Sequence, residues 1–298
     1  MTLYRIVLLL LSLLVSSGTL SAASGASPTP PGDGGGQIVF SLGIPPDGYD
    51  LYTINADGSN VIRLTENTFP DVFPVWSPDG SQIVFTSYRD GCDSVYMMDA
   101  DGTNVRRLTD CTAEAGQAAW SPDGTQIAFV RGEYPTLSLY LMNADGTDPH
   151  PLPMSDNDND YDPTWSPDGT QIAFVSERDG MPDIYVLERD SDRVRRLTDD
   201  PRGSWNPHWS PDGQQIAFVR GLHPTNEVYV MNADGTNQHG VTGLRGSRYP
   251  TWSPDGSQIA FVADQDGHAE IWIIDVDGTN RHRVTDLDAH IVHPSWNP

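Results

Sequence analysis

The sequence predicts an all-β fold: a six-bladed β-propeller built from four-stranded antiparallel blades. The first observation is a repeated motif, Trp-Ser-Pro-Asp-Gly, which begins at Trp76, Trp120, Trp165, Trp209 and Trp252, with a truncated copy at Trp296. The second is its spacing of 43 to 45 residues, because a constant period of this length indicates a repeat architecture. The third is that no stretch after residue 36 has the periodicity of an amphipathic helix.

Each repeat predicts four strands, as the copy at residues 162–199 illustrates. The first strand ends at Trp165, and the Ser-Pro-Asp-Gly that follows has the composition of a type I turn that closes a hairpin. Residues 171–175 form a second strand that is apolar on both faces, which indicates packing partners above and below it. A third strand covers 183–187, and a short fourth strand ends in Arg-Leu-Thr at 196–198. Four such strands make one propeller blade.

The two ends of the repeat region predict how the ring closes. Residues 37–40 match the second strand of a blade, whereas residues 293–296 match the first strand. We therefore expect the N-terminal and C-terminal strands to pair in a shared sixth blade, which would protect both strand edges. The repeated tryptophans are large and flat, so we expect them to pack between neighbouring blades.

The N-terminal segment predicts export. Residues 1–23 have the features of a signal peptide, because an apolar run at 6–15 is followed by small residues and is too short to span a membrane. Residues 24–36 are rich in Pro, Gly and Ser and predict a flexible linker, and residues 37–298 form the propeller. We therefore expect a secreted or periplasmic protein, with no stable membrane span after signal cleavage.

Charge and cysteine content narrow the possibilities further. The formal net charge of −24 at pH 7 argues against nucleic acid as a partner, because phosphate backbones are repelled. The chain has two cysteines, Cys92 and Cys111, which we place on one face of the same blade. In an oxidising compartment we expect them to form a disulfide. The alternative is two free thiols.

The motifs of common enzymes and metal sites are absent from the sequence. There is no Gly-x-Ser-x-Gly, no His-Glu-x-x-His and no phosphate-binding Gly loop, and His290 with His293 lacks a third metal ligand. The acidic segment 156–162 is similar to a calcium loop, but Tyr161 and Pro167 stand where an EF-hand needs Gly and Glu. We therefore expect no catalytic residue, no cofactor and no tight metal site.

The repeat as a whole resembles a known family. Trp-Ser-Pro-Asp-Gly, followed by Gln-Ile-Ala-Phe-Val, a strand ending in Asn-Ala-Asp-Gly and a final Arg-Leu-Thr, is similar to the WD-like β-propeller repeat of the TolB type. The resemblance covers residues 37–298 and implies a propeller that serves mainly as an interaction surface. Relatives often carry a companion α/β domain or an α/β-hydrolase domain. Neither is expected here, because the linker is short and the chain stops at Pro298.

The candidate binding site follows from where the repeats differ. The Ser-Pro-Asp-Gly turns lie on one predicted face, which we call the turn face; the more variable loops and the blade connections lie on the opposite face, where recognition is usual. Three residues before each tryptophan, the side chains all differ: Phe73, Gln117, Asp162, Asn206, Tyr249 and His293. We call these six residues the mouth ring. They would either bind a ligand at the channel mouth or merely fill the entrance.

These observations favour an exported, non-catalytic, monomeric binding module whose partner is a protein or a cell-envelope component. The alternative is an enzyme of the propeller class, such as a lyase or a hydrolase, that works at the channel mouth. A third interpretation is a metal-stabilised structural protein. Histidine and carboxylate groups with strongly perturbed pKa values at the mouth would favour the enzyme.

Overall fold

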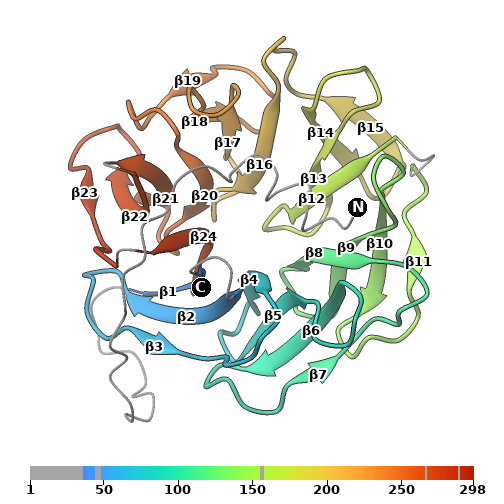
Figure 1. Ribbon diagram of the computed structural model, residues 1–298. Helices are drawn as coiled ribbons and strands as arrows, with labels where there is room; N and C mark the ends of the chain where they lie inside the picture. The colour runs from blue at the N-terminus through green and yellow to red at the C-terminus, as the bar shows by residue number, and fades with distance from the viewer. Residues whose placement is uncertain (1–35, 44–47, 155–157, 266, 288) are drawn as a thin grey trace.

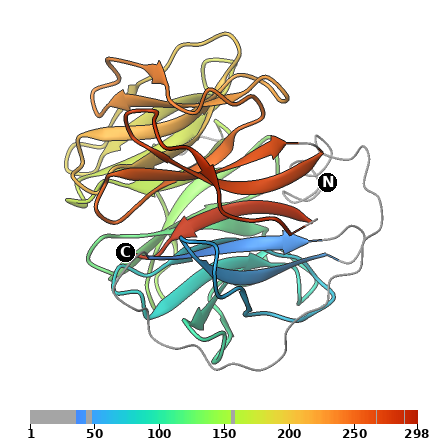
Figure 2. The ribbon, with the colours of Figure 1, turned by 90° about the vertical axis from the view of Figure 1, so that its left-hand side faces the viewer.

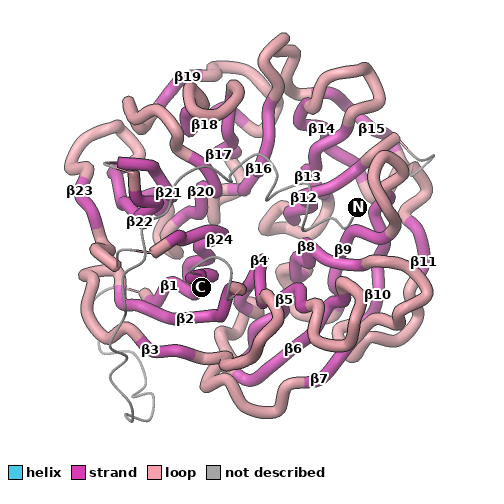
Figure 3. The backbone as a smooth tube through the Cα atoms, viewed as in Figure 1, coloured by secondary structure: helices cyan, strands magenta, loops and turns pink. Residues whose placement is uncertain are grey.

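The computed structural model describes residues 36–43, 48–154, 158–265, 267–287 and 289–298. The predicted signal peptide, and all of the predicted linker except Gly36, lie outside these ranges. The described residues form strands, turns and loops (Figure 3). Within them, no helix has the length and apolar character that a membrane crossing requires.

Four separate four-stranded antiparallel sheets surround a central axis (Figure 1). The first contains β4 (Asp71–Trp76), β5 (Gln82–Ser87), β6 (Ser94–Asp99) and β7 (Arg106–Arg107). The second contains β8 (Ala115–Trp120), β9 (Gln126–Arg131), β10 (Ser138–Asn143) and β11 (His150–Pro151). The third contains β12 (Asp160–Trp165), β13 (Gln171–Ser176), β14 (Asp183–Glu188) and β15 (Arg193–Arg196). The fourth contains β16 (Ser204–Trp209), β17 (Gln215–Arg220), β18 (Glu227–Asn232) and β19 (His239–Gly240).

The remaining eight strands form one sheet that closes the ring. One part is β20 (Arg248–Trp252), β21 (Gln258–Gln265), β22 (His268–Asp275) and β23 (His282–Arg283). The other is β24 (His290–Trp296), β1 (Gln37–Gly43), β2 (Tyr49–Asn55) and β3 (Ile62–Arg63). Strands β1 and β24 pair antiparallel, with Ile38 opposite Trp296, and they lie side by side in Figure 2. The predicted pairing of the N- and C-terminal strands is therefore confirmed.

The prediction of six separate four-stranded blades is wrong. The structure has four such blades and one continuous eight-stranded sheet. The physical reason is the hairpin of β21 and β22, whose strands have eight residues each, whereas the matching strands of the four separate blades have six. This extension brings Ala269 of β22 beside His290 of β24, where the two strands pair parallel. The gap that separates neighbouring blades elsewhere is therefore bridged here.

The core lies between adjacent sheets, as the tryptophan spacing predicts. Trp120 at the end of β8 packs with Val84 and Val95 of the preceding sheet, and Trp165 at the end of β12 packs with Val130 and Leu139. Both tryptophans are less than a tenth exposed. Burial of such large apolar side chains is the main favourable contribution to folding.

The turn that follows each tryptophan is built in the same way every time. In the turn after Trp165, the Ser166 hydroxyl donates to Asp168 Oδ1 at 2.6 Å and accepts the Gln171 backbone N–H at 2.9 Å. Gly169 has φ +71°, a conformation that favours glycine. The equivalent Ser–Asp distances in the other four turns are 2.6 to 2.7 Å. These turns fix the hairpin between the two innermost strands of each blade.

The two cysteines form a disulfide between Cys92 and Cys111, with Cα atoms 5.9 Å apart. Cys92 lies in the loop between β5 and β6, and Cys111 lies in the connection from β7 to β8. The predicted bridge is therefore confirmed. It ties two segments together on the face opposite the turn face.

Candidate functional site

The mouth ring lies on the innermost strands of the propeller, namely β4, β8, β12, β16, β20 and β24. At each ring position the strand pairing slips; in β12, for example, Tyr161 pairs with Val175 but Thr164 pairs with Ala173. Such a slip is a β-bulge, which re-aims the side chain at that point. The backbone there has φ between 48° and 54° at all six positions. Positive φ is uncommon for residues other than glycine.

The bulges bring the six ring residues around one cavity on the propeller axis. The cavity encloses about 150 Å³. After each ring residue, the next residue also lines the wall, and it is proline in five strands and Ala118 in β8. The ring residue is the third residue of β4, β8, β12 and β16. It therefore lies close to the blade connection that precedes each strand, and the cavity lies toward the variable face. The structure thus places all six predicted site residues together.

The ring divides into two chemically different halves. Gln117, Asp162 and Asn206 follow one another around the axis and form the polar half. Asn206 donates its amide Nδ2–H to Asp162 Oδ2 at 2.7 Å, and Gln117 Oε1 accepts the Asp162 backbone N–H at 3.3 Å. These contacts link three separate blades through one residue: Asn206 binds the carboxylate of Asp162, and Gln117 binds its backbone N–H.

The aromatic half consists of Tyr249, His293 and Phe73, which come from β20, β24 and β4. The imidazole centroid of His293 lies 3.7 Å from that of Phe73 and 4.4 Å from that of Tyr249. The histidine is therefore held between two aromatic rings. The channel mouth presents amide and carboxylate groups on one side and aromatic rings on the other.

Burial controls the charge of the ring. It raises the pKa of Asp162 to about 6, although hydrogen bonds from Asn206 oppose this shift. Burial also raises the pKa of Tyr249 to about 12. At pH 7 Asp162 is therefore mostly ionised and Tyr249 is neutral.

His293 is the most unusual member of the ring. It is 8% exposed, and within the described part of the chain neither Nδ1 nor Nε2 has a hydrogen-bond partner. Burial and the positive charge of Arg248 keep the pKa of His293 well below its ordinary value, so the imidazole is neutral. A buried polar group without a partner is costly, and this one lines the cavity.

Sequence reasoning missed a second tier of lining residues, one step deeper in the channel. Two residues after Asn206, His208 also lines the cavity, and burial lowers its pKa to about 4. Thr164 and Ser295 occupy matching positions in β12 and β24. The alternation of side chains along a strand was the available signal. It places residues two apart on the same face of a strand, and Asn206 and His208 both line the cavity.

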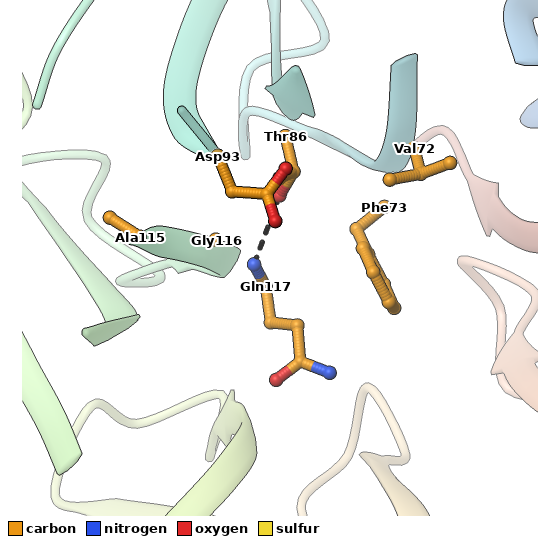
Figure 4. Close-up of a pocket in the computed structure, with 7 residues that line it drawn as sticks. All are labelled: Val72, Phe73, Thr86, Asp93, Ala115, Gly116 and Gln117. Atoms are coloured by element: carbon orange, nitrogen blue, oxygen red, sulfur yellow. Dashed lines mark hydrogen bonds between the residues drawn. The ribbon is translucent and has the colours of Figure 1, made fainter. Parts of the chain in front are cut away.

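A small cavity beside the main one shows how a bulge is supported (Figure 4). It encloses about 10 Å³ between Phe73 and Gln117. The Gln117 backbone N–H donates to the Thr86 hydroxyl of the preceding blade at 3.1 Å. A Cβ added at Gly116 would lie 2.8 Å from that hydroxyl oxygen, so glycine permits this close approach. The backbone of the bulge at Gln117 is therefore held by a hydrogen bond to the preceding blade.

The acidic segment 156–162 distributes its described carboxylates among different contacts. Asp160 is fully buried and accepts hydrogen bonds from Arg178 Nη2 on both oxygens at 3.1 Å, and Asp158 lies 3.8 Å from the same nitrogen. Asp162 belongs to the ring instead. Positions 156 and 157 lie outside the described residues. Across the described part of the chain, no group of three His, Cys, Asp or Glu residues is arranged to hold a metal ion.

The strands and their closed arrangement define a β-propeller, and comparison with known proteins specifies its family. Residues 18–135 and 111–298 match the family model described as the TolB beta propeller domain. The chain belongs to this family. The predicted resemblance to the TolB-type repeat is confirmed.

Individual relatives agree at the level of the fold. The Tol-Pal system protein TolB of Blochmanniella pennsylvanica is 37% identical over 57 residues, which is 18% of this chain and only 13% of that protein. The crystal structure of TolB from Acinetobacter baumannii has a TM-score of 0.80 at 24% identity, and the match covers 90% of this chain and 68% of that chain.

More distant structures show the uses of the same fold. A chain of a nidogen/laminin complex has a TM-score of 0.72 at 11% identity, covering 89% of this chain and 99% of that one. Hydrazine synthase of Kuenenia stuttgartiensis has a TM-score of 0.73 at 16% identity, covering 89% of this chain and 47% of that one. The fold alone therefore does not decide between binding and catalysis.

Proposed function

We propose that this protein is an exported, non-catalytic binding module that holds a protein or cell-envelope partner at the channel mouth. The observation that carries the proposal is the mouth ring. Six equivalent backbone positions, all with positive φ, present six different side chains to one cavity. Packing alone would favour the same residue at equivalent positions, as it does in the turns. Variation at a rigid, constrained position is typical of recognition.

The surroundings of the mouth support a macromolecular partner. The variable face carries exposed apolar side chains in four connections: Phe69, Tyr134, Met181 and Leu222 are 41%, 48%, 40% and 57% exposed. Apolar and aromatic side chains around a pocket are typical of protein interfaces. The name of the curated relative, a Tol-Pal system protein, supports an envelope partner and an extracytoplasmic location, in the periplasm or outside the cell.

The experiment is capture of partners from envelope extract by the full chain, expressed with its own N-terminal segment. The site variant is Phe73→Ala with Tyr249→Ala, and the matched control is Asp123→Ala with Asp168→Ala on the turn face. We expect the wild type and the control to retain the same partner, and the site variant to lose it while still giving a β-sheet circular dichroism spectrum. Equal capture by all three proteins would contradict the proposal.

A propeller-class lyase or hydrolase is the second candidate, and the perturbed groups favour it. Burial raises the pKa of Asp162 and lowers the pKa of His293, and such shifts are common in active sites. The two groups lie in different halves of the ring, however, and Asp162 is occupied by an amide. Mass spectrometry of the captured partner distinguishes the two functions. Binding predicts an unchanged mass after incubation, whereas a lyase or hydrolase predicts fragments.

A further inference from the structure

The carboxylate of Asp162 differs from the two fully buried carboxylates on the innermost strands. Asp71 and Asp160 are fully buried, and each is paired with an arginine, Arg89 at 3.0 Å and Arg178 at 3.1 Å. Asp162 lies two residues after Asp160 on the same strand and lines the cavity, and the partner of its Oδ2 is the neutral amide of Asn206 instead of a cation. A buried charge is normally paired. Asp162 therefore has the place for a cation but not the cation itself.

The aromatic half of the ring is suited to the same charge. The faces of Phe73 and Tyr249 carry the negative part of an aromatic quadrupole, which attracts cations. Neutral His293 has one nitrogen that accepts a hydrogen bond, and no described residue donates to it. Both halves of the mouth ring therefore offer acceptors to a positively charged group.

One fixed positive charge, that of Arg248, already lies beside the aromatic half of the ring but outside the cavity. Arg248 precedes Tyr249 on β20, and its guanidinium lies 5.9 Å from the Tyr249 ring centroid. Its Nη1 is occupied by Asp264 at 2.9 Å and by the Gly246 carbonyl at 3.0 Å. It does not line the cavity with the mouth ring. The net charge of −24 attracts mobile cations to the protein from a distance.

We infer that the channel mouth binds a positively charged nitrogen group on an alkyl stem, a guanidinium or a primary ammonium. Its N–H groups donate to Asp162 and His293, and its stem lies against Phe73 and Tyr249. The inference rests on the proposed binding function and specifies the chemistry of the bound group. An arginine or lysine side chain of a protein partner and a free polyamine share this chemistry.

Calorimetric titration of the full chain separates these sources. The probes are the capped tripeptides acetyl-Gly-Arg-Gly-amide and acetyl-Gly-Lys-Gly-amide, the same peptide with neutral citrulline, and free spermidine. We expect the charged peptides to bind and the citrulline peptide to bind at least tenfold more weakly, because a hydrogen bond to a charged group contributes about 1.5–3 kcal/mol. Tight binding of spermidine alone would identify a polyamine site rather than a peptide site.

Two variants locate the effect. Asp162→Asn keeps the shape of the ring but removes its charge, and we expect binding of the charged peptides to weaken about ten- to a hundredfold. Asp168→Asn removes a charge from the turn face and should leave binding unchanged. Unchanged affinity in Asp162→Asn, equal binding of citrulline and arginine peptides, or no binding of any cation at millimolar concentration would each overturn the inference.

A failure of the cation inference can be distinguished from a failure of the proposed binding function. If Phe73→Ala with Tyr249→Ala abolishes capture of the envelope partner but Asp162→Asn does not, the mouth is a binding site for a different chemistry. If neither variant changes capture, the proposed function itself is wrong.

Discussion

The turn face and the mouth ring lie near opposite ends of the innermost strands, and they differ in how far residue identity is repeated from copy to copy. On the turn face, five copies of Ser-Pro-Asp-Gly make the same contact, a serine hydroxyl donating to an aspartate oxygen at 2.6 to 2.7 Å. In the ring, six equivalent positions carry six different residues. The backbone is constrained in both places, because glycines in the turns and ring residues in the bulges all have positive φ.

The difference shows why residue identity is fixed in the turns and free to vary in the ring. In the turn, the serine and aspartate side chains complete the hydrogen bonds of the hairpin, so the backbone conformation depends on their identity. In the bulge, a neighbouring blade can support the backbone, as Thr86 supports Gln117, and the ring side chain itself points into a cavity. Its identity is therefore open to selection for a ligand. The turn face serves folding, and the ring serves the proposed recognition.

The largest expected effect comes from removing the strand that carries one ring residue and closes the propeller. Deletion of residues 290–298 removes β24, which carries His293 and pairs with β1. We expect a loss of several kcal/mol or a failure to fold, because an unpaired edge and a row of buried residues become exposed. Thermal unfolding followed by circular dichroism measures this. A truncated protein that melts like the full chain would show that terminal pairing does not hold the ring closed.

The disulfide should have the next largest effect, and it acts only on the variable face. Cys92 and Cys111 are 19 residues apart in the sequence, and closing a loop of this length stabilises the chain by about 3 kcal/mol. We expect the double variant Cys92→Ser with Cys111→Ser to lower the free energy of unfolding by that amount in urea titration. Alkylation of the non-reduced protein, read by mass spectrometry, is the control. Uptake of the reagent by both cysteines would mean that the bridge does not form.

A single turn should matter less, and only for stability. Asp168→Ala removes the acceptor for the Ser166 hydroxyl and for the Thr170 backbone N–H, so we expect a loss of about 1.5 kcal/mol. These hydrogen bonds lower the pKa of Asp168. The wild-type advantage should therefore be present above the ordinary carboxyl range and fade as the pH falls through it. A change in peptide affinity in this variant would contradict the claim that the turn face affects stability alone.

The smallest effect should be a gain in stability within the ring. Because the folded-state pKa of Asp162 is about 6 instead of 3.8, the folded protein binds the proton more tightly than the unfolded chain does. The charged form therefore opposes folding above pH 6, and this penalty disappears as the pH falls toward 4. We expect Asp162→Asn to be about 1 kcal/mol more stable at pH 7.5, with the gain vanishing near pH 4. A loss of stability at pH 7.5 would contradict this.

Much of the fold is predictable from the sequence because turn chemistry and strand composition repeat with the period. The strands, the terminal pairing and the Cys92–Cys111 bridge all follow from it. The joining of β22 to β24 could not be predicted, because it depends on a hairpin that is longer than its counterparts and on one bridge at Ala269.

The positions of the ring were predictable, but its geometry was not. Comparison of the copies identified which residues differ. The three polar residues come from consecutive repeats, and so do the three aromatic residues once the ring closes, so the division into two halves also follows from the sequence. The bulge was not apparent, because proline or alanine after the ring residue does not by itself specify a positive φ at the preceding position. The missing partners of His293 and the place of His208 depend on contacts between strands that are far apart in the sequence.

The most direct test of the contrast between the two regions is a crystal structure of the full chain with acetyl-Gly-Arg-Gly-amide at millimolar concentration. We predict that the guanidinium lies in the channel mouth, within hydrogen-bond distance of Asp162, and that its stem contacts Phe73 or Tyr249. The five turns of the turn face should be unchanged and without ligand. A structure in which the peptide binds the turn face, or in which the ring holds only water while the protein binds the peptide elsewhere, would contradict the account.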